Sequence, residues 1–202
     1  MQPLIRSVLL RGVSPSPPRW EAAFGRRAPL EVDLGCGRGD YALERARGRP
    51  DLDLVALDAR RSWVLELRRK AATAGLRNLR AICCDAGCDL PLLFGPSTVR
   101  GFTIFHPDPW WKKRHRKRRL VKPQFVALLA RLLEPQGWVF VQTDVPDLAA
   151  EIEQIFLSSL DFLPIEPQQF FLRFGPLPPS RRQKRCERLG LPFRRLVFLK
   201  KS

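Results

Sequence analysis

The sequence predicts an α/β domain built on a mostly parallel sheet that is covered by helices on both faces. From Leu30 onwards, short apolar runs alternate with segments of helical periodicity. The short runs are apolar at successive positions, which is typical of strands buried on both faces. With 202 residues, 45% of them hydrophobic, the chain can bury the core of one domain, whereas two domains would be cramped.

The first five strands and four helices are expected in alternation along the compact part of the chain. In the second expected helix, Val64, Leu67, Ala71 and Ala74 form one apolar stripe, and Pro146 suits the first turn of the fourth. Strands are expected at 30–34, 52–57, 79–82, 102–105 and 138–142, and helices at 40–47, 61–74, 122–133 and 146–160.

Both ends of the chain depart from this alternation. Residues 1–28 contain several prolines among serine and arginine and are expected to form a partly ordered lead-in to a single domain at 29–202. Near the other end, 170–173 and 193–199 read as two strands. A proline- and arginine-rich loop without a helix is expected to join them, and antiparallel pairing would suit them.

The net charge of +16 favours an anionic partner, with nucleic acid first and an acidic membrane surface second. A GC-rich genome would raise the arginine content everywhere, but it does not explain why the charge gathers at 112–119 and 181–195. No apolar stretch approaches the ~18 residues of a membrane span, and the N-terminal apolar run is too short for a secretory signal. We therefore expect a cytoplasmic protein without a membrane partner.

The cysteines predict free thiols rather than disulfides or a metal site. Their number is five, which is odd, and the expected core is large. Cys83, Cys84 and Cys88 lie close together, but zinc ligands usually come as spaced pairs with a second pair elsewhere. No metal is expected.

A glycine-rich turn follows the first expected strand and predicts a nucleoside-bearing cofactor. Gly35, Gly37 and Gly39 allow the backbone to turn sharply and to approach a ligand closely. Asp58, at the end of the second strand, has the reach to bind ribose hydroxyls. The G-x-G-x-G spacing differs from the G-x-G-x-x-G of dinucleotide-binding proteins, which disfavours a nicotinamide oxidoreductase.

Carboxylates around this turn favour S-adenosylmethionine as the cofactor. Asp33 and Asp40 bracket the turn with negative charge, which suits an amino group and a sulfonium better than a pyrophosphate. Asp85, after the third strand, could accept a hydrogen bond from an adenine amino group. Taken singly, Asp58 and Asp85 could equally be helix caps or turn residues.

A rigid loop after the fourth strand predicts a second site. Asp108 stands between two prolines, and two tryptophans and a cationic tract follow it. Asp108 and Asp144 are expected at the same sheet edge as the glycine turn, and Lys112 can reach a phosphate or a base carbonyl. The tract could be a solvated face or a nuclear-localisation run, but its place favours phosphate contacts by Lys113, Arg114, Arg116, Lys117 and Arg118.

From Phe24 to Gly190, the chain resembles the bacterial tRNA (guanine-N7)-methyltransferase family. The most specific match is Pro107-Asp108-Pro109-Trp110, followed by Lys112, Arg114-His115 and Lys117-Arg118-Arg119. Further matches are the glycine turn, Cys84-Asp85-Ala86, Thr143-Asp144 and Glu187-Arg188-Leu189-Gly190. The resemblance implies a class I, Rossmann-like methyltransferase domain with a seven-stranded sheet. It also implies S-adenosylmethionine as methyl donor and a guanine in the variable loop of tRNA as acceptor.

The resemblance also assigns site residues. It implies that Asp33, Asp58, Asp85 and Asp108 line the cofactor site and that Lys112 and Asp144 bind the guanosine. The family's Thr-x-aromatic-Glu stretch falls on Ser180-Arg181-Arg182-Gln183. Serine keeps the hydroxyl, but Arg182 is not aromatic and Gln183 lacks the carboxylate. Ser180, Arg181 and Gln183 remain candidate substrate contacts on this basis.

Guanine N7 carries a free lone pair, so its attack on a sulfonium methyl needs no general base. The expected edge carries carboxylates and no histidine at the position of a base, and Asp108 is the candidate catalytic residue. Three alternatives stay open: methylation of another RNA or atom, a non-catalytic RNA-binding module, and, least favoured, an oxidoreductase. The oligomeric state, monomer or homodimer, is not determined by the sequence.

Overall fold

The computed structural model describes residues 16–202, and part of the expected lead-in at 1–28 therefore lies outside the described residues. The strands are β1 (Leu30–Leu34), β2 (Asp53–Asp58), β3 (Leu79–Cys83), β4 (Val99–Phe105), β5 (Leu133–Thr143), β6 (Phe162–Ile165) and β7 (Arg194–Lys200). The helices are α2 (Trp20–Phe24), α3 (Asp40–Gly48), α4 (Arg61–Thr73), α5 (Ala86–Leu93), the 3-10 helix η1 (Lys113–Arg118), α6 (Pro123–Leu132), α7 (Pro146–Leu157), α8 (Pro167–Phe174) and α9 (Arg181–Arg188).

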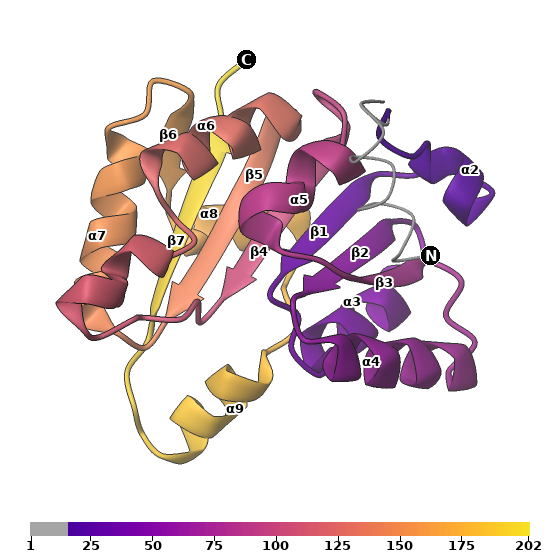
Figure 1. Cartoon of the computed structure of the whole chain (residues 1–202), viewed down its shortest axis with the longest axis horizontal. Coiled ribbons are helices and arrows are strands. Elements are labelled where there is room, and N and C mark those ends of the chain that lie inside the picture. The colour runs from indigo at the N-terminus through magenta and orange to yellow at the C-terminus, as the bar shows by residue number, and fades with distance from the viewer. Residues whose placement is uncertain (1–15) are drawn as a thin grey trace.

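The strands form one seven-stranded sheet in the order β3-β2-β1-β4-β5-β7-β6 (Figure 1). The first five strands are parallel, and β7 runs antiparallel to both of its neighbours, β5 and β6. The predicted α/β class is confirmed, and the strands and helices expected before residue 161 are all present. β4 and β5 begin earlier than expected, and their register shifts between Val99 and Gly101.

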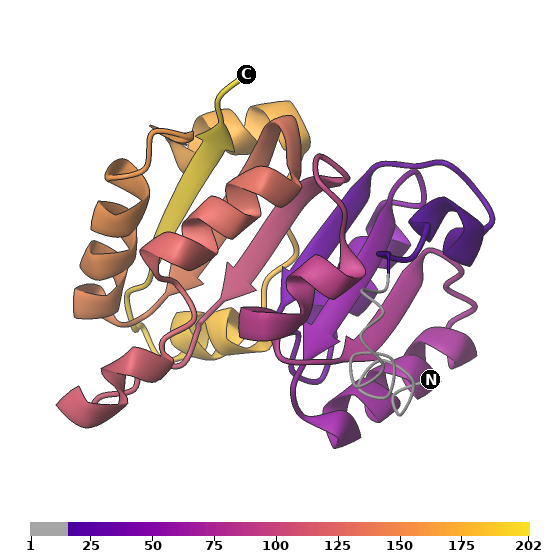
Figure 2. The same ribbon diagram turned by 45° about the horizontal axis from the view of Figure 1, so that its top comes forward.

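Helices cover both faces of the sheet. α5, α6 and α7 pack on one face around Phe102, Val139 and Leu129. α3 and α4 cover the other face over β2 and β3, and α8 covers it over β5 and β7. Figures 1 and 2 show α9 apart from these layers, below the ends of β4 and β5. No helix in residues 16–202 is both long and apolar enough to cross a membrane.

The prediction of a strand at 170–173 is wrong, because this segment lies within α8. Pro167 occupies the first turn, where its missing N–H is not needed. Phe170 and Phe174, four residues apart, are buried on one side of the helix against Trp138, while Leu172 is 89% exposed. The antiparallel partner of β7 near the end of the chain is instead β6.

The prediction that no helix lies between the last two strands is also wrong. α9 begins after Ser180, whose Oγ accepts a hydrogen bond from the backbone N–H of Gln183 at 3.2 Å. The pattern Ser-x-x-Gln is a known helix-start signal. The polar composition of the segment hid this signal, because only Gln183 and Cys186 of α9 are buried.

Gly101 in β4 is required by the close approach of a tryptophan. Trp138 lies opposite Gly101 in β5 and is fully buried. A Cβ atom at position 101 would lie 2.1 Å from Trp138 Cε2, so the ring or the strand must move. Overpacking of this kind typically destabilises a core by about 1–3 kcal/mol.

We predict that Gly101→Ala lowers the free energy of unfolding by about 2 kcal/mol or more, measured by urea unfolding. Gly95→Ala is the matched control, since its nearest new contact is Thr98 Cγ2 at 3.5 Å, an ordinary distance. Equal stability of the two variants would contradict the proposed clash.

Candidate active site

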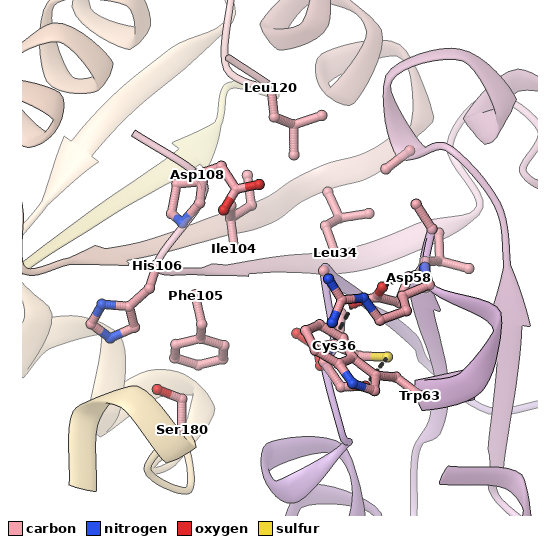
Figure 3. Close-up of a pocket in the computed structure, with 18 of the residues that line it drawn as sticks. Leu34, Cys36, Asp58, Trp63, Ile104, Phe105, His106, Asp108, Leu120 and Ser180 are labelled. Carbon is pink, nitrogen blue, oxygen red and sulfur yellow. Dashed lines mark hydrogen bonds between the residues drawn. The ribbon is translucent and has the colours of Figure 1, made fainter. Parts of the chain in front are cut away.

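A cavity of about 940 Å³ lies at the carboxyl edge of the sheet. It is lined by the loops that follow β1, β2, β3 and β4 and by the start of α9. Figure 3 shows Asp58 and Trp63 on one side, Asp108 and His106 on the other, and Ser180 on α9. The cofactor residues predicted from the sequence that line this cavity are Asp33, Gly35, Gly37, Asp58, Asp85 and Asp108.

Gly39 does not line the cavity and has a packing role. It precedes α3 with φ of +81°, and a Cβ atom there would lie 2.3 Å from Leu67 Cδ1. Glycine at this position therefore lets α3 begin against α4.

The glycine turn and Asp58 hold each other in place. Leu57 O accepts hydrogen bonds from the backbone N–H groups of Gly35 (2.9 Å) and Cys36 (2.8 Å). Asp58 accepts two more, from Gly37 N to Oδ2 at 2.9 Å and from Arg60 N to Oδ1 at 2.8 Å. Because each carboxylate oxygen has two lone pairs, Asp58 keeps capacity for further donors, such as hydroxyl groups.

Asp33 is the buried carboxyl group of the site. It is 2% exposed, and its Oδ1 accepts a hydrogen bond from Thr103 Oγ1 at 2.9 Å. Burial raises the pKa of Asp33 to about 7, against the lowering effect of the Thr103 hydrogen bond, and the charge of Asp58 adds to the rise. A cation in the cavity would favour the ionised form, so the site is suited to a positively charged ligand.

Asp85 is a helix cap, which is one of the two roles that the sequence left open. It lines the cavity, and it is also the N-cap of α5, where Oδ1 accepts a hydrogen bond from Gly87 N at 2.9 Å. Its backbone N–H donates to Asp89 Oδ2 at 2.8 Å. The cap fixes the direction of the carboxylate at the end of β3.

Aromatic residues that sequence reasoning missed complete the cavity wall. Trp63 carries the guanidinium of Arg60 4.1 Å from its ring centroid, and Tyr41 packs against Phe105 with a centroid distance of 4.6 Å. The buried hydroxyl of Tyr41 makes no well-formed hydrogen bond within residues 16–202. Burial raises the pKa of Tyr41 well above its usual value, which keeps the hydroxyl protonated as an available donor. The only sequence signal for these residues was their place at the end of a strand or in the helix that follows a strand.

Burial disfavours the thiolate form of the two thiols in the cavity wall. Burial raises the pKa of Cys36, and it raises that of Cys84 to about 12, so both stay protonated at neutral pH. A protonated thiol is a poor nucleophile and a poor metal ligand. In the described part of the chain, no group of three or more His, Cys, Asp or Glu side chains is arranged to hold a metal.

The loop that carries Asp108 has a strained backbone. His106 and Trp110, on either side of it, have positive φ angles of 48° and 44°, which are uncommon for residues other than glycine. Asp108 is exposed at the cavity. The ring of Trp110 meets His115 edge-on at 5.9 Å, and the guanidinium of Arg118 lies 5.1 Å from it. The cationic tract thus folds back over Trp110.

The predicted phosphate contacts fall into two groups. Arg118 stacks on Trp110 and lines the cavity. The other four residues share η1 with Arg118 but do not line the cavity. They are exposed and form no ion pair with the described residues: Lys113, Arg114, Arg116 and Lys117. Lys112 is exposed at the start of η1 and does not line the cavity.

His106 lines the cavity, but both of its ring nitrogens are occupied. Nδ1 lies 2.8 Å from Asp144 Oδ1, and Nε2 lies 3.1 Å from Gln142 Nε2. Because an amide nitrogen can only donate, His106 Nε2 accepts and Nδ1 carries the proton. Burial lowers the pKa of His106 and keeps it neutral. This assignment leaves His106 without a free nitrogen to act as a base.

Asp144 and Gln183 anchor α9 to β5 rather than line the cavity. Arg182 Nε donates to Asp144 Oδ2 at 3.0 Å. Although partial burial acts to raise it, hydrogen bonds from Arg182 and His106 lower the pKa of Asp144 to about 2. Gln183 accepts from Gln142 Nε2 at 3.1 Å and donates to Glu187 Oε1 at 2.7 Å. These contacts bring Ser180 and Arg181 to the cavity wall.

Comparisons with known proteins give consistent results. A family model described as "Putative methyltransferase" matches residues 27–190. A protein of Myxococcus xanthus named tRNA (guanine-N(7)-)-methyltransferase is 36% identical over 193 residues, which cover 92% of this chain and 90% of that protein. A protein of the same name from Synechococcus sp. (strain JA-2-3B'a(2-13)) is 37% identical over 181 residues, covering 89% and 75%.

Solved structures show a shared fold at lower identity. The 16S rRNA methyltransferase KamB matches with a TM-score of 0.63 and 21% identity, covering 91% of this chain and 93% of that one. The aminoglycoside resistance methyltransferase NpmB1 matches with a TM-score of 0.60 and 22% identity, covering 90% and 91%.

We predict that Asp33→Asn stabilises the ligand-free protein at about pH 8. Asp33 has a raised pKa in the folded state, so its contribution to stability is present below about pH 4 and is lost as the pH rises to about 7. At about 1.4 kcal/mol per pKa unit, the gain is up to about 4 kcal/mol at pH 8 and vanishes near pH 4. Urea unfolding at the two pH values measures the difference in the free energy of unfolding between the variant and the parent. A difference that does not change with pH would contradict the burial of an ionised carboxylate.

Proposed function

The chain belongs to the family of tRNA (guanine-N7)-methyltransferases, and on this premise we propose how its residues move a methyl group from S-adenosylmethionine to N7 of a tRNA guanine. The observation that carries the proposal is one cavity lined by carboxylates from the ends of four successive strands, beside a cationic tract. The methyl donor is S-adenosylmethionine and the acceptor is tRNA. The variable loop as the place of the guanine, and a cytoplasmic location, are further parts of the proposal.

The cavity fits S-adenosylmethionine in charge and in polar groups. Its wall combines several carboxylates, aromatic rings and the Tyr41 hydroxyl that lacks a well-formed partner. Asp58 would bind the ribose hydroxyls with oxygens that two backbone N–H groups already orient. Asp85 would accept from the adenine amino group. Asp33 would ionise on binding and stabilise the positive end of the cofactor.

The protein's part in the transfer is to position the reactants and stabilise charge. S-adenosylmethionine supplies a methyl group on a positively charged sulfur. Guanine N7 would attack the methyl carbon with its own lone pair while the carbon–sulfur bond breaks and the sulfur leaves as a neutral thioether. This transfer needs no base, which agrees with a His106 whose nitrogens are both engaged. Asp108 would accept hydrogen bonds from the amino edge of the guanine and stabilise the positive charge that develops on the ring.

Two cationic elements flank the cavity and would hold the tRNA. On one side, η1 presents exposed cations without ion-pair partners in residues 16–202. On the other side, the start of α9 brings Ser180, Arg181 and Arg182 to the wall. Phosphate contacts of this kind are independent of sequence and weaken steeply with salt. Lys112, at the start of η1, would reach the guanosine or its phosphate.

Methyl transfer from labelled S-adenosylmethionine to unmodified bulk tRNA tests the function, with the product nucleosides separated and the modified position mapped. We expect 7-methylguanosine from a variable-loop guanine. A different methylated nucleoside would keep the fold and overturn the acceptor. Tight tRNA binding without transfer would favour a binding protein built on a methyltransferase frame.

In the same assay, we predict that Asp108→Asn lowers the turnover number by about 10²-fold, because the variant loses the charge that stabilises the methylated ring. The dissociation constant for tRNA should change little, since many phosphate contacts remain. Asp147→Asn is the matched control, because Asp147 is also exposed and lies in the first turn of α7 at the same edge. Equal losses of turnover and tRNA affinity would argue against the catalytic role of Asp108.

A further inference from the structure

Arg119 differs from the other cations of the tract 112–119. Its side chain is only 6% exposed, whereas Lys113, Arg116 and Lys117 are exposed. Arg119 Nε donates to the carbonyl oxygen of Pro109 at 2.8 Å. Its Nη1 forms an ion pair with Glu151 of α7. The guanidinium therefore joins the loop that carries Asp108 to a helix of the domain.

Apart from the ring contacts of Trp110 with His115 and Arg118, few interactions hold this loop. Among the described residues, 107–111 take part in no backbone–backbone hydrogen bond outside helices and strands. Two of these residues are prolines, which have no N–H to donate. The bond from Arg119 to Pro109 is the one side-chain hydrogen bond to this segment within residues 16–202. This bond holds the peptide segment between Asp108 and Trp110, and Trp110 has a φ angle of +44°. A backbone held in this sparsely populated region needs surroundings that fix it.

A buried guanidinium must be paired, and Arg119 directs Nε to the carbonyl of Pro109 and Nη1 to Glu151 inside the protein. It is therefore unsuited to a phosphate of the tRNA. Lysine would keep the charge but not the planar fork that reaches the carbonyl and the carboxylate together.

We propose that Arg119 is a positioning residue for methyl transfer. It fixes Asp108 and Trp110 at the cavity through the carbonyl of Pro109, with Glu151 as its anchor on α7, and it makes no phosphate contact. This inference rests on the proposed function. The cationic tract thus has two roles: exposed members bind RNA, and its last arginine holds the catalytic loop.

The test compares Arg119→Lys with the parent enzyme in steady-state methyl transfer to tRNA. We expect the turnover number to fall by about tenfold to a hundredfold, since a small misplacement of a reacting group has effects of this size. The KM for tRNA should stay within about twofold of the parent value. Arg131→Lys, at an exposed position on α6, is the control and should keep the parent rate. If the parent enzyme transfers no methyl group, the proposed function is overturned. If the parent is active and Arg119→Lys turns over at the parent rate, the positioning role is overturned.

The salt dependence of tRNA binding separates positioning from phosphate contact. Arg116→Gln should reduce the slope of log K against log salt by about 0.7–0.9, the value for one phosphate contact. Arg119→Gln should leave the slope unchanged, because its charge is buried. An equal reduction in the two variants overturns the proposal.

Glu151→Gln provides a second route if the Arg119 variants fold poorly. The Glu151 side chain is 39% exposed, and the variant leaves Arg119 and its bond to Pro109 in place. Turnover should fall in the same direction but less than in Arg119→Lys. When both can be measured, the double variant should be no slower than Arg119→Lys alone. The shared anchor is overturned if Glu151→Gln turns over at the parent rate. It is also overturned if the losses of turnover in the two single variants multiply in the double variant.

Discussion

The pairing of β1 between β2 and β4 is the constraint on which the site depends. After β1 the chain continues to β2 and β3 in one half of the sheet, and after β4 it continues to β5 in the other half. The loops after β1 and β4 therefore diverge. Such a switch point leaves a crevice at the carboxyl edge of a parallel sheet. Each parallel strand ends there, so Asp33, Asp58, Asp85 and Asp108 meet although they are distant in the sequence. No single loop could bring them together.

Charge is divided in a way that suits two ligands of opposite sign. The interior of the cavity is acidic, and burial makes one of its carboxyl groups hard to ionise until a cation arrives. The outer elements η1 and α9 are basic. A cationic cofactor would therefore face the acidic interior, and a polyanionic substrate would face the basic outer elements. One loop separates these two regions. Asp108 lies between these regions, on the segment that the basic tract folds over.

Some of this organisation could be read from the sequence, and the rest depends on tertiary contacts. The buried strands, the glycine turn and the strand-end carboxylates were predictable because apolar runs and glycine spacing are local signals. The strand predicted at 170–173 failed because a short apolar run does not distinguish a strand from a buried helix face. Nothing local marks Arg119 as buried among exposed cations, or pairs Asp144 with Arg182 38 residues later.

The position of β6 at the edge of the sheet has a consequence for the order of folding. β6 precedes β7 in the chain, but within residues 16–202 it has β7 as its one strand neighbour, and β7 must itself pair with β5. During synthesis, β6 therefore waits until α8, α9 and β7 have left the ribosome. The start of α9 supplies Ser180 and Arg181 to the cavity wall, so the closing of this edge and the completion of the site both need chain that follows β6. A nascent chain that has folded its first five strands still lacks part of the wall of its active site.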